Sequence, residues 1–297
     1  MKILLLGATG TIGSAVLSEL LQHDHAVLAL ARSDISEQAL RQTGAEVIRG
    51  DIVSPSHWST HLCHVDAVVH VAATFCQDMG AIDRKLIDEL VAQGNKLGRK
   101  IRFIYTGGVW LYGHTENQVV SENSPFNPIS SFCWMIENSA LITRAQCFDA
   151  NIIHPGIVYD RDSGALSGFV PDKGQIEVWG SLETRWPVVH VNDLASTYRL
   201  ILEKGCDGES YNVCGEQGVK VGDIADAYRK RFDLTTQPVV RPVEDVIAEH
   251  GDWALGATLD QLMSADKIKR ELNWRAHHND ILSYINEPNS PFATSPS

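Results

Sequence analysis

The sequence has no long apolar run and no excess of basic residues. None of its apolar stretches approaches the ~20 residues of a membrane-spanning helix, so we expect no membrane span and no membrane partner. Its 25 basic residues are outnumbered by 37 acidic ones, which gives a formal charge of −12, and no segment is rich in lysine or arginine. Because an acidic surface repels phosphate backbones, we expect no nucleic-acid partner.

Cysteine is scarce and scattered. The six cysteines form no C-x-x-C pair; they stand at positions 63, 76, 133, 147, 206 and 214. This is neither the ligand spacing of a zinc site nor a dense disulfide framework, so we predict no metal site. Free thiols in a reducing compartment are the simplest interpretation. The apolar run at the N-terminus is too short for a signal peptide, so we expect a cytoplasmic protein.

Short apolar runs alternate with amphipathic segments in the first half of the chain. The runs predict strands at 2–6, 26–31, 46–49, 66–71, 101–106 and 151–154, with helices at 14–23, 36–42 and 79–97 between them. This alternation predicts parallel strands joined by right-handed crossovers. Near-continuous apolar strands fit a sheet that is covered on both faces. We therefore predict an α/β fold with a Rossmann-type doubly wound parallel sheet, whose ligands lie at the carboxyl ends of the strands.

Three glycines at the spacing G-x-x-G-x-x-G separate the first predicted strand from the first predicted helix. In that context the first glycine permits a tight turn, the second lets backbone amides approach a pyrophosphate, and the third lets the helix pack close to the strand. The helix N-terminus then faces the negative phosphates. This favours a dinucleotide site over a purely structural glycine turn. The predicted contacts from this loop are Gly7, Thr9, Gly10, Thr11, Ile12 and Gly13.

The end of the second predicted strand carries Arg32 and Ser33 and no carboxylate. A carboxylate there would bind the ribose 2′-hydroxyl of NAD, whereas a cation and a hydroxyl suit the 2′-phosphate of NADP. We therefore favour NADP (NADPH) over NAD, with a solvated end-of-strand arginine as the alternative. Asp51 and Ile52 follow the third predicted strand, where the aspartate is placed to accept from the adenine amino group unless it is a simple loop aspartate.

The alternation of strands and helices ends near residue 160, where Gly- and Pro-rich loops begin. We expect residues 1–160 to form the dinucleotide-binding core, with 185–205 returning to it. Residues 161–184 and 206–288 are expected to form a small C-terminal substrate-binding lobe, with helices at 222–232 and 264–272. A further helix is expected at 191–203, in the segment that returns to the core. The tail at 289–297 is polar and rich in Pro and Ser, so we expect it to be flexible.

Further motifs follow in order along nearly the whole chain. They read VHVAA at 69–73, YTGGVWLYG at 105–113, HPGIVY at 154–159, VHVNDLA at 189–195 and KIKRELNW at 267–274. With the glycine loop and Asp51, they resemble the extended and atypical short-chain dehydrogenase/reductases, the NAD(P)-dependent epimerase/dehydratase-like group. The resemblance implies a small-molecule substrate and a possible homodimer through helices at 79–97 and 131–147. It also implies cofactor contacts from Ala72, Ala73, Thr74, Thr106, Pro155 and Val158.

The resemblance fails at the catalytic pair of that group, Tyr-x-x-x-Lys. In the group the tyrosine is the general acid/base, and the lysine one turn later holds the ribose and lowers the pKa of the tyrosine. Here Ile129 and Cys133 occupy the two positions, and none of the seven tyrosines has a lysine four residues later. The group's usual serine falls on Gly107 or Gly108, which leaves Thr106 as the nearest hydroxyl.

Several side chains near strand ends are candidates for the missing proton donor. Tyr112 offers a phenol, although such a tyrosine often packs its loop, and His154 offers a group that titrates near neutral pH unless it is a core histidine. Cys133 has no basic neighbour in the sequence, so we interpret it as an inert thiol. His190 fits a structural joint between the lobes. We predict Tyr112, His154 and Thr106 as the catalytic residues.

Three functions fit these observations. We favour an NADP-dependent oxidoreductase that reduces a carbonyl, imine or activated alkene of a small, fairly apolar molecule, because hydride transfer needs only cofactor and substrate held in line. The tryptophans near the expected pocket suit an apolar substrate better than a nucleotide-sugar. The alternatives are an NADP-sensing regulator or partner-binding protein without turnover, and a redox-neutral isomerase, cyclase or dehydratase. The sequence names neither the substrate nor the proton donor.

Overall fold

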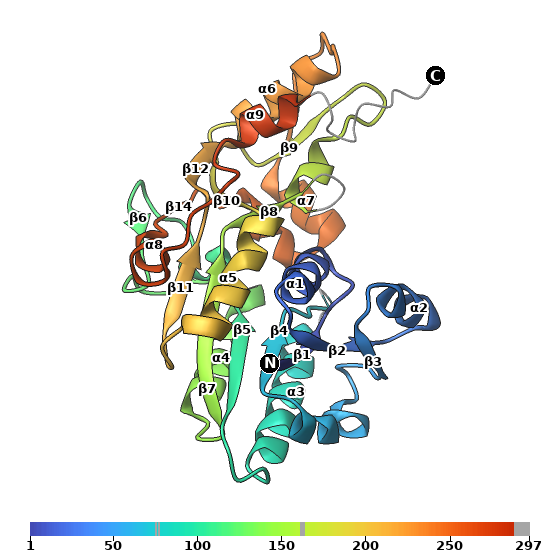
Figure 1. The fold of residues 1–297 in the computed structure, drawn as a ribbon. Coiled ribbons are helices and arrows are strands. Elements are labelled where there is room, and N and C mark those ends of the chain that lie inside the picture. Colours follow the sequence, from blue (N-terminus) through green and yellow to red (C-terminus); the bar gives the residue numbers. More distant parts are fainter. Residues whose placement is uncertain (75, 77, 161–163, 288–297) are drawn as a thin grey trace. The chain divides into compact units, whose positions relative to one another are not determined.

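The computed structural model describes residues 1–74, 76, 78–160 and 164–287 (Figure 1). The predicted flexible tail at 289–297 lies outside the described residues, as do residues 161–163 of the first loop after the expected core. In the described part of the chain, no helix has the length and apolar character needed to cross a membrane. All six cysteines are free thiols.

The chain forms two compact units. The first contains Met1–Gly107, Cys133–His154 and Leu194–Tyr211, and the second contains Gly108–Phe132, Pro155–Asp193 and the chain from Asn212 onward. Residues 108–132, 155–160 and 185–193, which are expected in the core, lie in the second unit, and residues 206–211, which are expected in the lobe, lie in the first. For 108–132 the reason is a long-range pairing within the second unit, where Val119–Val120 pairs with Leu262–Met263. The separate roles expected for a nucleotide core and a substrate lobe stay predictions.

A seven-stranded sheet has the order β11-β7-β5-β4-β1-β2-β3. Its strands are β1 (Lys2–Leu6), β2 (Ala26–Ala31), β3 (Glu46–Arg49), β4 (Ala67–His70), β5 (Ile101–Thr106), β7 (Phe148–Pro155) and β11 (Ser210–Val213). The strands from β7 to β3 pair in parallel. The order runs outward in one direction from β1 and in the other from β4. This confirms the predicted doubly wound sheet, and it places the reversal, where ligands bind in such sheets, between β1 and β4.

Helices cover both faces of this sheet in the first unit (Figure 1). They are α1 (Thr11–Gln22), α2 (Asp34–Gln42), α3 (Met79–Gly94), α4 (Trp134–Arg144) and α5 (Val191–Lys204). Successive side chains of a strand point to opposite faces, so Tyr105 and Thr106 of β5 identify the two layers. Tyr105 bonds to Asp83 of α3, and Thr106 bonds to Tyr198 of α5. The apolar core on the α3 and α4 side includes Leu4, Leu6, Leu86, Leu90, Phe103 and Ile142.

The second unit is built from short strands and helices. A three-stranded sheet joins β12 (Glu216–Lys220), β10 (Arg185–His190) and β8 (Ile157–Tyr159), and two small ladders join β13 (Val239–Arg241) with β9 (Glu177–Trp179) and β14 (Leu262–Met263) with β6 (Val119–Val120). The helices are α6 (Val221–Arg231), α7 (Val243–His250), α8 (Asp266–Leu272) and α9 (Ile281–Asn286). An aromatic core that includes Tyr159, Phe169, Trp186 and Tyr228 holds them together.

Short 3₁₀ turns connect several of these elements. They are η1 (Pro55–His57), η2 (Ser59–His64), η3 (Val109–Tyr112), η4 (Ser130–Phe132), η5 (Ala165–Phe169) and η6 (Asp252–Thr258). The predicted helices at 222–232 and 264–272 correspond to α6 and α8. The strands of the second unit were not predicted, because this part of the sequence lacks the regular alternation of apolar runs and amphipathic helices that identified the strands of the first unit.

Candidate nucleotide-binding site

Two glycines of the loop between β1 and α1 are required by the protein itself. Gly7 has a φ of +92°, and a Cβ added to it would lie 2.8 Å from the backbone N and Cα of Ala72. A Cβ on Gly13 would lie 1.9 Å from the carbonyl oxygen of Gly7. Any side chain at either position would therefore force the backbone apart. These contacts hold the start of α1 and the end of β4 close to the turn.

Gly10 differs from its two neighbours in the motif. Its φ of −80° suits any residue, and a Cβ there would meet only the Gly7 carbonyl oxygen, at an ordinary contact distance of 3.4 Å. Its amide closes the turn on that same oxygen at 3.0 Å. Because Gly10 is exposed, a side chain would occupy the solvent side of the loop. The absence of a Cβ thus leaves space on the solvent side of the loop.

The N-terminus of α1 suits an anion in both space and charge. No side chain caps it, and its first turn contains no acidic residue. The amides of the first helical turn have no acceptor within the helix, and the helix dipole favours negative charge at this end. A pyrophosphate therefore fits the cradle that Gly10 leaves open. Of the other predicted contacts in the loop, Thr9 is exposed, and Thr11 and Ile12 are half-buried.

Arg32 stands exposed just after β2, with no acidic partner among the described residues. Its acidic neighbours are engaged elsewhere, since Arg49 lies 2.9 Å from Asp34 and Arg41 lies 2.8 Å from Glu37. Arg49 also reaches Glu37 at 3.4 Å. The positive charge of Arg32 is therefore not neutralised by an ion pair, which suits a phosphate ligand.

Ser33 begins helix α2. Its hydroxyl accepts from the amide of Ser36 at 3.2 Å, and the Ser36 hydroxyl accepts from the amide of Ser33 at 2.9 Å. This reciprocal capping explains why α2 begins at Asp34 rather than at the predicted Ser36. The S-x-x-S spacing was a signal in the sequence that our prediction of the helix start missed.

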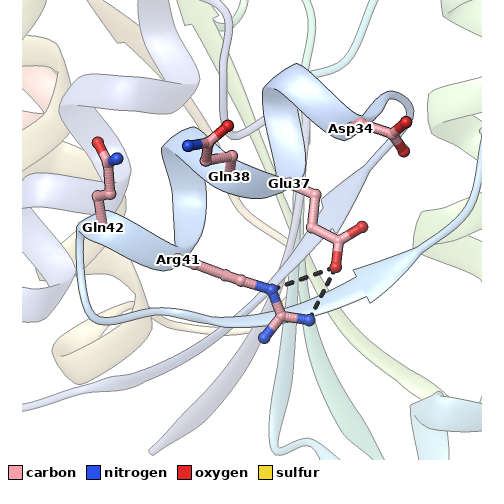
Figure 2. A pocket seen from close by; sticks show the side chains of 5 residues that line it. All are labelled: Asp34, Glu37, Gln38, Arg41 and Gln42. Atoms are coloured by element: carbon pink, nitrogen blue, oxygen red, sulfur yellow. Dashed lines mark hydrogen bonds and ion pairs between the residues drawn. The ribbon is translucent and has the colours of Figure 1, made fainter.

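The outer flank of α2 carries a shallow depression. Its lining side chains all come from this one helix, and Figure 2 shows the Arg41 guanidinium bonded to Glu37 across one turn. Groups from a single exposed helix flank do not converge on a ligand as the walls of a cleft would. We therefore place the candidate site at the glycine loop, not here.

Asp51 lies in the turn that follows β3, and Trp58 holds this turn. The Trp58 indole donates to the Asp51 carbonyl oxygen at 2.8 Å, and the Val53 amide donates to a carboxylate oxygen of Asp51 at 3.1 Å. A Cβ on Gly50 would lie 2.3 Å from the Trp58 ring, so the glycine is needed for this packing. Asp51 and Ile52 are half-buried, and Ile52 packs against the core.

The end of β4 lies against the glycine loop. Ala72 faces Gly7 directly, Ala73 is exposed and Thr74 is half-buried. The structure thus brings together two of the predicted cofactor segments, the loop after β1 and the segment after β4. Pro155 and Val158 belong to the second unit, where Pro155 is buried and Val158 is half-buried, and their contact with a cofactor stays a prediction.

Thr106, at the end of β5, has a partner that the sequence did not reveal. Its hydroxyl lies 2.7 Å from the hydroxyl of Tyr198, which is fully buried on α5. Burial raises the pKa of the Tyr198 phenol above its ordinary value, so this phenol stays protonated near neutral pH. Thr106 itself is half-buried. The two residues are 92 positions apart, so no local sequence pattern predicts their pairing.

The other two predicted catalytic residues lie in protein interiors. Tyr112 is 3% exposed in the second unit, and its hydroxyl donates to Asn212 at 2.8 Å while its ring packs against Phe126. Burial raises its pKa above the usual value. His154 is 2% exposed in the first unit, and burial lowers its pKa to about 4, so it is neutral at pH 7. Their catalytic role stays a prediction.

Ile129 and Cys133, at the positions predicted for the tyrosine and the lysine, both precede α4 in the chain. Ile129 is half-buried just before η4, and Cys133 carries an exposed thiol immediately before the helix. Helix α4 packs tightly on α3, as the contact of Gly80 with Trp134 shows. A Cβ added to Gly80 would lie 2.6 Å from the Trp134 ring. Isoleucine carries no proton to transfer, and cysteine is too short to make the ribose contact of the lysine.

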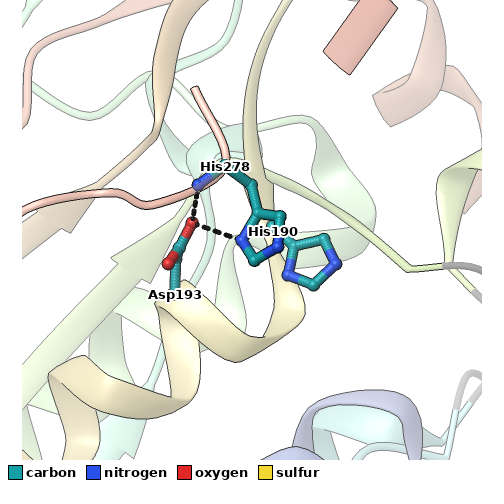
Figure 3. Close-up of side chains that lie close together, drawn as sticks. All are labelled: His190, Asp193 and His278. Carbon is teal, nitrogen blue, oxygen red and sulfur yellow. Dashed lines mark hydrogen bonds and ion pairs between the residues drawn. The ribbon is translucent and has the colours of Figure 1, made fainter. Parts of the chain in front are cut away.

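A cluster of His190, Asp193 and His278 in the second unit has the composition of a metal site but not its geometry (Figure 3). The two imidazole rings stack with their centroids 3.7 Å apart at an interplanar angle of 21°. Imidazole lone pairs lie in the ring plane, so stacked rings do not converge on one ion. The Asp193 carboxylate already accepts from the amides of His277 at 3.0 Å and His278 at 2.7 Å. All three residues belong to the second unit, so the role of His190 as a joint between the lobes stays a prediction.

Comparison with known proteins gives a family and several relatives. The sequence model of the NAD dependent epimerase/dehydratase family matches residues 3–214. An uncharacterized protein of Saccharomyces cerevisiae is 29% identical over 300 residues, which cover 96% of this chain and 98% of that protein. A UDP-glucose 4-epimerase of Corynebacterium glutamicum is 22% identical, covering 97% and 94%. The structure of a dTDP-glucose 4,6-dehydratase of Streptomyces venezuelae, with NAD bound, superposes with a TM-score of 0.81 at 18% identity, covering 99% and 98%.

Proposed function

The chain belongs to the NAD dependent epimerase/dehydratase family, and from this premise we propose that it is an NADP-dependent oxidoreductase of the atypical short-chain dehydrogenase/reductase type. Its substrate in this proposal is a small, fairly apolar carbonyl, imine or activated alkene. The observation that carries the proposal is the contrast among the three glycines of the loop. Gly7 and Gly13 are demanded by protein packing, whereas Gly10 is free of it and faces the outside. A glycine kept for a ligand's approach fits a pyrophosphate at the start of α1.

The preference for NADP rests on charge around the end of β2. In the proposal, Arg32 binds the ribose 2′-phosphate, and Asp51 accepts from the adenine amino group. The pairing of Asp34 with Arg49 and of Glu37 with Arg41 supports this assignment, because both carboxylates near Arg32 are held by other cations. In the proposal Ser33 contributes to this phosphate site as the N-cap residue of α2, which places the first amides of that helix next to it.

The nicotinamide of the bound cofactor supplies the hydride, so the protein has to hold the substrate in line and provide a proton. We assign the contact with the substrate oxygen to the Thr106 hydroxyl, since it is half-buried at the carboxyl end of β5. Tyr198 stands behind it as a protonated phenol at 2.7 Å and can replace the proton that Thr106 gives up. The burial of Tyr112 and His154 favours a supporting role for these two.

A second candidate function is an NADP-binding regulator without turnover. The loss of both members of the Tyr-x-x-x-Lys pair favours it, because Ile129 carries no proton to transfer and Cys133 is too short to make the ribose contact of the lysine. In this alternative the nucleotide site is the same, and its occupancy rather than a reaction carries the signal.

We also propose that the protein is cytoplasmic and forms a homodimer through α3 and α4. The six free thiols support a reducing compartment. Half-buried apolar side chains at the start of α4, Trp134, Met135 and Ile136, support the pairing with a second copy. Sedimentation of the purified protein at several concentrations tests the dimer, which is contradicted by a monomer at all of them.

The test of the proposed function is a titration of the purified protein with NADPH, NADP⁺ and NADH, followed by the fluorescence of the reduced nicotinamide. Binding that favours NADPH over NADH supports the nucleotide site and Arg32. A screen of small carbonyls, imines and activated alkenes for substrate-dependent NADPH oxidation then separates the oxidoreductase from the regulator. Product formation without net NADPH change would instead indicate redox-neutral chemistry, and no binding of any dinucleotide would end the proposal.

A further inference from the structure

A buried polar cluster lies beneath the end of β4, between the sheet and the helices α3 and α4. It consists of His70, Asp83, Tyr105 and Asn138, none more than 7% exposed. The Asp83 carboxylate is its centre. One oxygen lies 2.7 Å from His70 Nε2, and the other accepts from the Tyr105 hydroxyl at 2.9 Å and from the Asn138 amide at 2.7 Å. Such a set of donors around one buried carboxylate satisfies it fully.

The directions of these hydrogen bonds determine the state of His70. An ionised carboxylate can only accept, so the proton of the ring lies on Nε2 and faces Asp83. The opposite ring nitrogen is then left as an acceptor. It accepts from the backbone amide of Ala72 at 3.4 Å. Asp83 therefore fixes the tautomer of His70, and the tautomer decides whether the Ala72 amide finds an acceptor.

Ala72 is the residue against which the glycine loop closes. A Cβ on Gly7 would lie 2.8 Å from the Ala72 backbone N, and the preceding amide, of Val71, donates to the Leu6 carbonyl oxygen at 3.1 Å. The position of the Ala72 amide thus determines the position of the backbone beside the glycine loop. A shift of that amide would move the backbone of Ala72 that Gly7 contacts.

The same turn occurs a second time in the chain. The sequence VVHV stands at 68–71 and again at 188–191. At the end of β10 the amide of Asn192 donates to His190 Nδ1 at 3.2 Å, again from two residues further along. His190 Nε2 lies 3.4 Å from the Tyr284 hydroxyl and 4.0 Å from the Asp160 carboxylate. A histidine that receives the amide two positions later is therefore a recurrent way in which this chain ends a strand.

We propose that His70 and Asp83 are positioning residues for the nucleotide site. Asp83 holds the ring with its proton on Nε2, so that Nδ1 holds the Ala72 amide and, through it, the backbone that faces Gly7. The inference rests on the proposed function only in that the bound molecule is a dinucleotide. It predicts that the acceptor at Nδ1, and not the bulk of the imidazole, supports nucleotide affinity.

Two substitutions of His70 distinguish the contribution of Nδ1 from that of Nε2. His70→Asn retains an acceptor oxygen close to the position of Nδ1, in the geometry by which asparagine receives the amide two residues later, and loses the contact with Asp83. His70→Gln places its amide nearer to the position of Nε2, so it can still donate to Asp83 but has no acceptor for Ala72. We expect His70→Gln to weaken NADPH binding about tenfold, the loss of one hydrogen bond that orders the site, and His70→Asn to change it less than about twofold.

Tyr105→Phe is the matched control. It removes a donor from the same carboxylate but leaves the ring of His70 and the Ala72 amide in place. We expect it to lower the melting temperature while the dissociation constant for NADPH stays within about twofold of the parent value. If Tyr105→Phe weakens binding as much as His70→Gln, or if the two His70 variants weaken it equally, general loosening explains the effect and the proposal is overturned.

A measurement on the protein without cofactor keeps the inference separate from the proposed function. Nitrogen-15 NMR of the His70 ring is expected to show the proton on Nε2. Hydrogen exchange of the Ala72 amide is expected to accelerate about tenfold in His70→Gln and to stay near the parent rate in His70→Asn. If this pattern appears in a protein that binds no dinucleotide, the positioning of the Ala72 amide by His70 stands and the proposed function fails. A proton on Nδ1, or equal exchange in all variants, overturns the positioning role whatever the protein binds.

Discussion

Gly13 approaches Gly7 so closely that the Cβ which Gly13 lacks would lie 1.9 Å from the Gly7 carbonyl oxygen. Gly10, three residues earlier, has no such constraint, because its missing Cβ would stand 3.4 Å from that same oxygen. Protein packing therefore requires the glycine at position 13, whereas in the proposed function the glycine at position 10 makes room for the ligand. This difference can be tested by giving each a single methyl group.

Gly10→Ala is expected to fold normally and to lose nucleotide affinity. Its backbone angles suit alanine, and glycine and alanine differ by only a few tenths of a kcal/mol to about 1 kcal/mol at such positions, so the free energy of unfolding should change little. The new Cβ occupies the side from which the pyrophosphate approaches, and we expect NADPH binding to weaken at least about tenfold. Denaturant unfolding and a fluorescence titration measure the two effects.

Gly13→Ala is the contrasting variant, and we expect it to lose about 2 kcal/mol or more of stability by overpacking against Gly7. Weakened binding in Gly13→Ala would then follow from a displaced α1. Should Gly10→Ala bind NADPH as well as the parent protein, the space beside Gly10 does not receive a phosphate, and the main support for the proposed function is lost.

Arg32→Ser is expected to reduce the preference for NADPH over NADH. A charge-assisted hydrogen bond to phosphate contributes roughly 1.5–3 kcal/mol, so NADPH binding should weaken about 10- to 100-fold while NADH binding stays nearly unchanged. Raising the salt concentration should weaken NADPH binding in the parent protein more than in the variant. Parallel titrations with the two reduced cofactors measure the ratio.

Arg41→Ser is the control for loss of positive charge near the same site. Arg41 lies on α2 and pairs with Glu37, which also has Arg49 within 3.4 Å, so its removal leaves Arg32 as it was. We expect the ratio of NADPH to NADH affinity to stay within about twofold of the parent value. An equal loss in both variants would show that net charge, and not a contact from Arg32, determines the preference.

Much of the first unit follows from the sequence, and the reason is local. The predicted bounds of β1, β2, β3 and β5 agree with the structure residue for residue, because each is a short apolar or strand-favouring run bounded by turn residues. The glycine loop was also recognisable, because its three glycines at regular spacing directly follow a predicted strand and precede a predicted helix. The interpretation of these segments needed no information from distant parts of the chain.

What the sequence did not reveal depends on contacts between distant residues. Tyr198 joins Thr106 across 92 positions, and Asp83 of α3 joins His70 of β4 across 13, so neither pairing leaves a local pattern. The membership of 108–132 in the second unit depends on a two-residue ladder. The repeated VVHV was visible, but only the hydrogen bonds from Ala72 and Asn192 give it a meaning.

Thr106→Val is expected to abolish most turnover on whichever substrate the screen returns. Valine keeps the shape of threonine and removes the hydroxyl, so a proton donor at this position would be lost and kcat would fall about 100-fold or more. The dissociation constant for NADPH should stay nearly unchanged, since a proton donor acts on the substrate. Steady-state kinetics of the variant, with a parallel titration, measure both quantities.

Tyr198→Phe tests the hydroxyl that stands behind Thr106. Because the phenol lies 2.7 Å from the threonine hydroxyl and acts through it, we expect a smaller fall in kcat and no further fall when Tyr198→Phe is added to Thr106→Val. Full turnover in Thr106→Val would remove Thr106 from the mechanism. Additive losses in the double variant would show that Tyr198 acts by another route.

His154 is expected to make the stability of the protein dependent on pH on the acidic side. Burial lowers the pKa of His154 to about 4 in the folded state from 6.5, so between these values the unfolded chain binds more protons than the folded one. The stabilisation is therefore present above about pH 6.5 and is lost as the pH falls towards 4, by on the order of 3 kcal/mol in full. Replacing His154 with Gln should flatten the curve of unfolding free energy against pH in this window, while His57→Gln, at an exposed site, should leave it unchanged. Urea unfolding at several pH values compares the three proteins, and an unaltered slope in His154→Gln would show that another group carries the dependence.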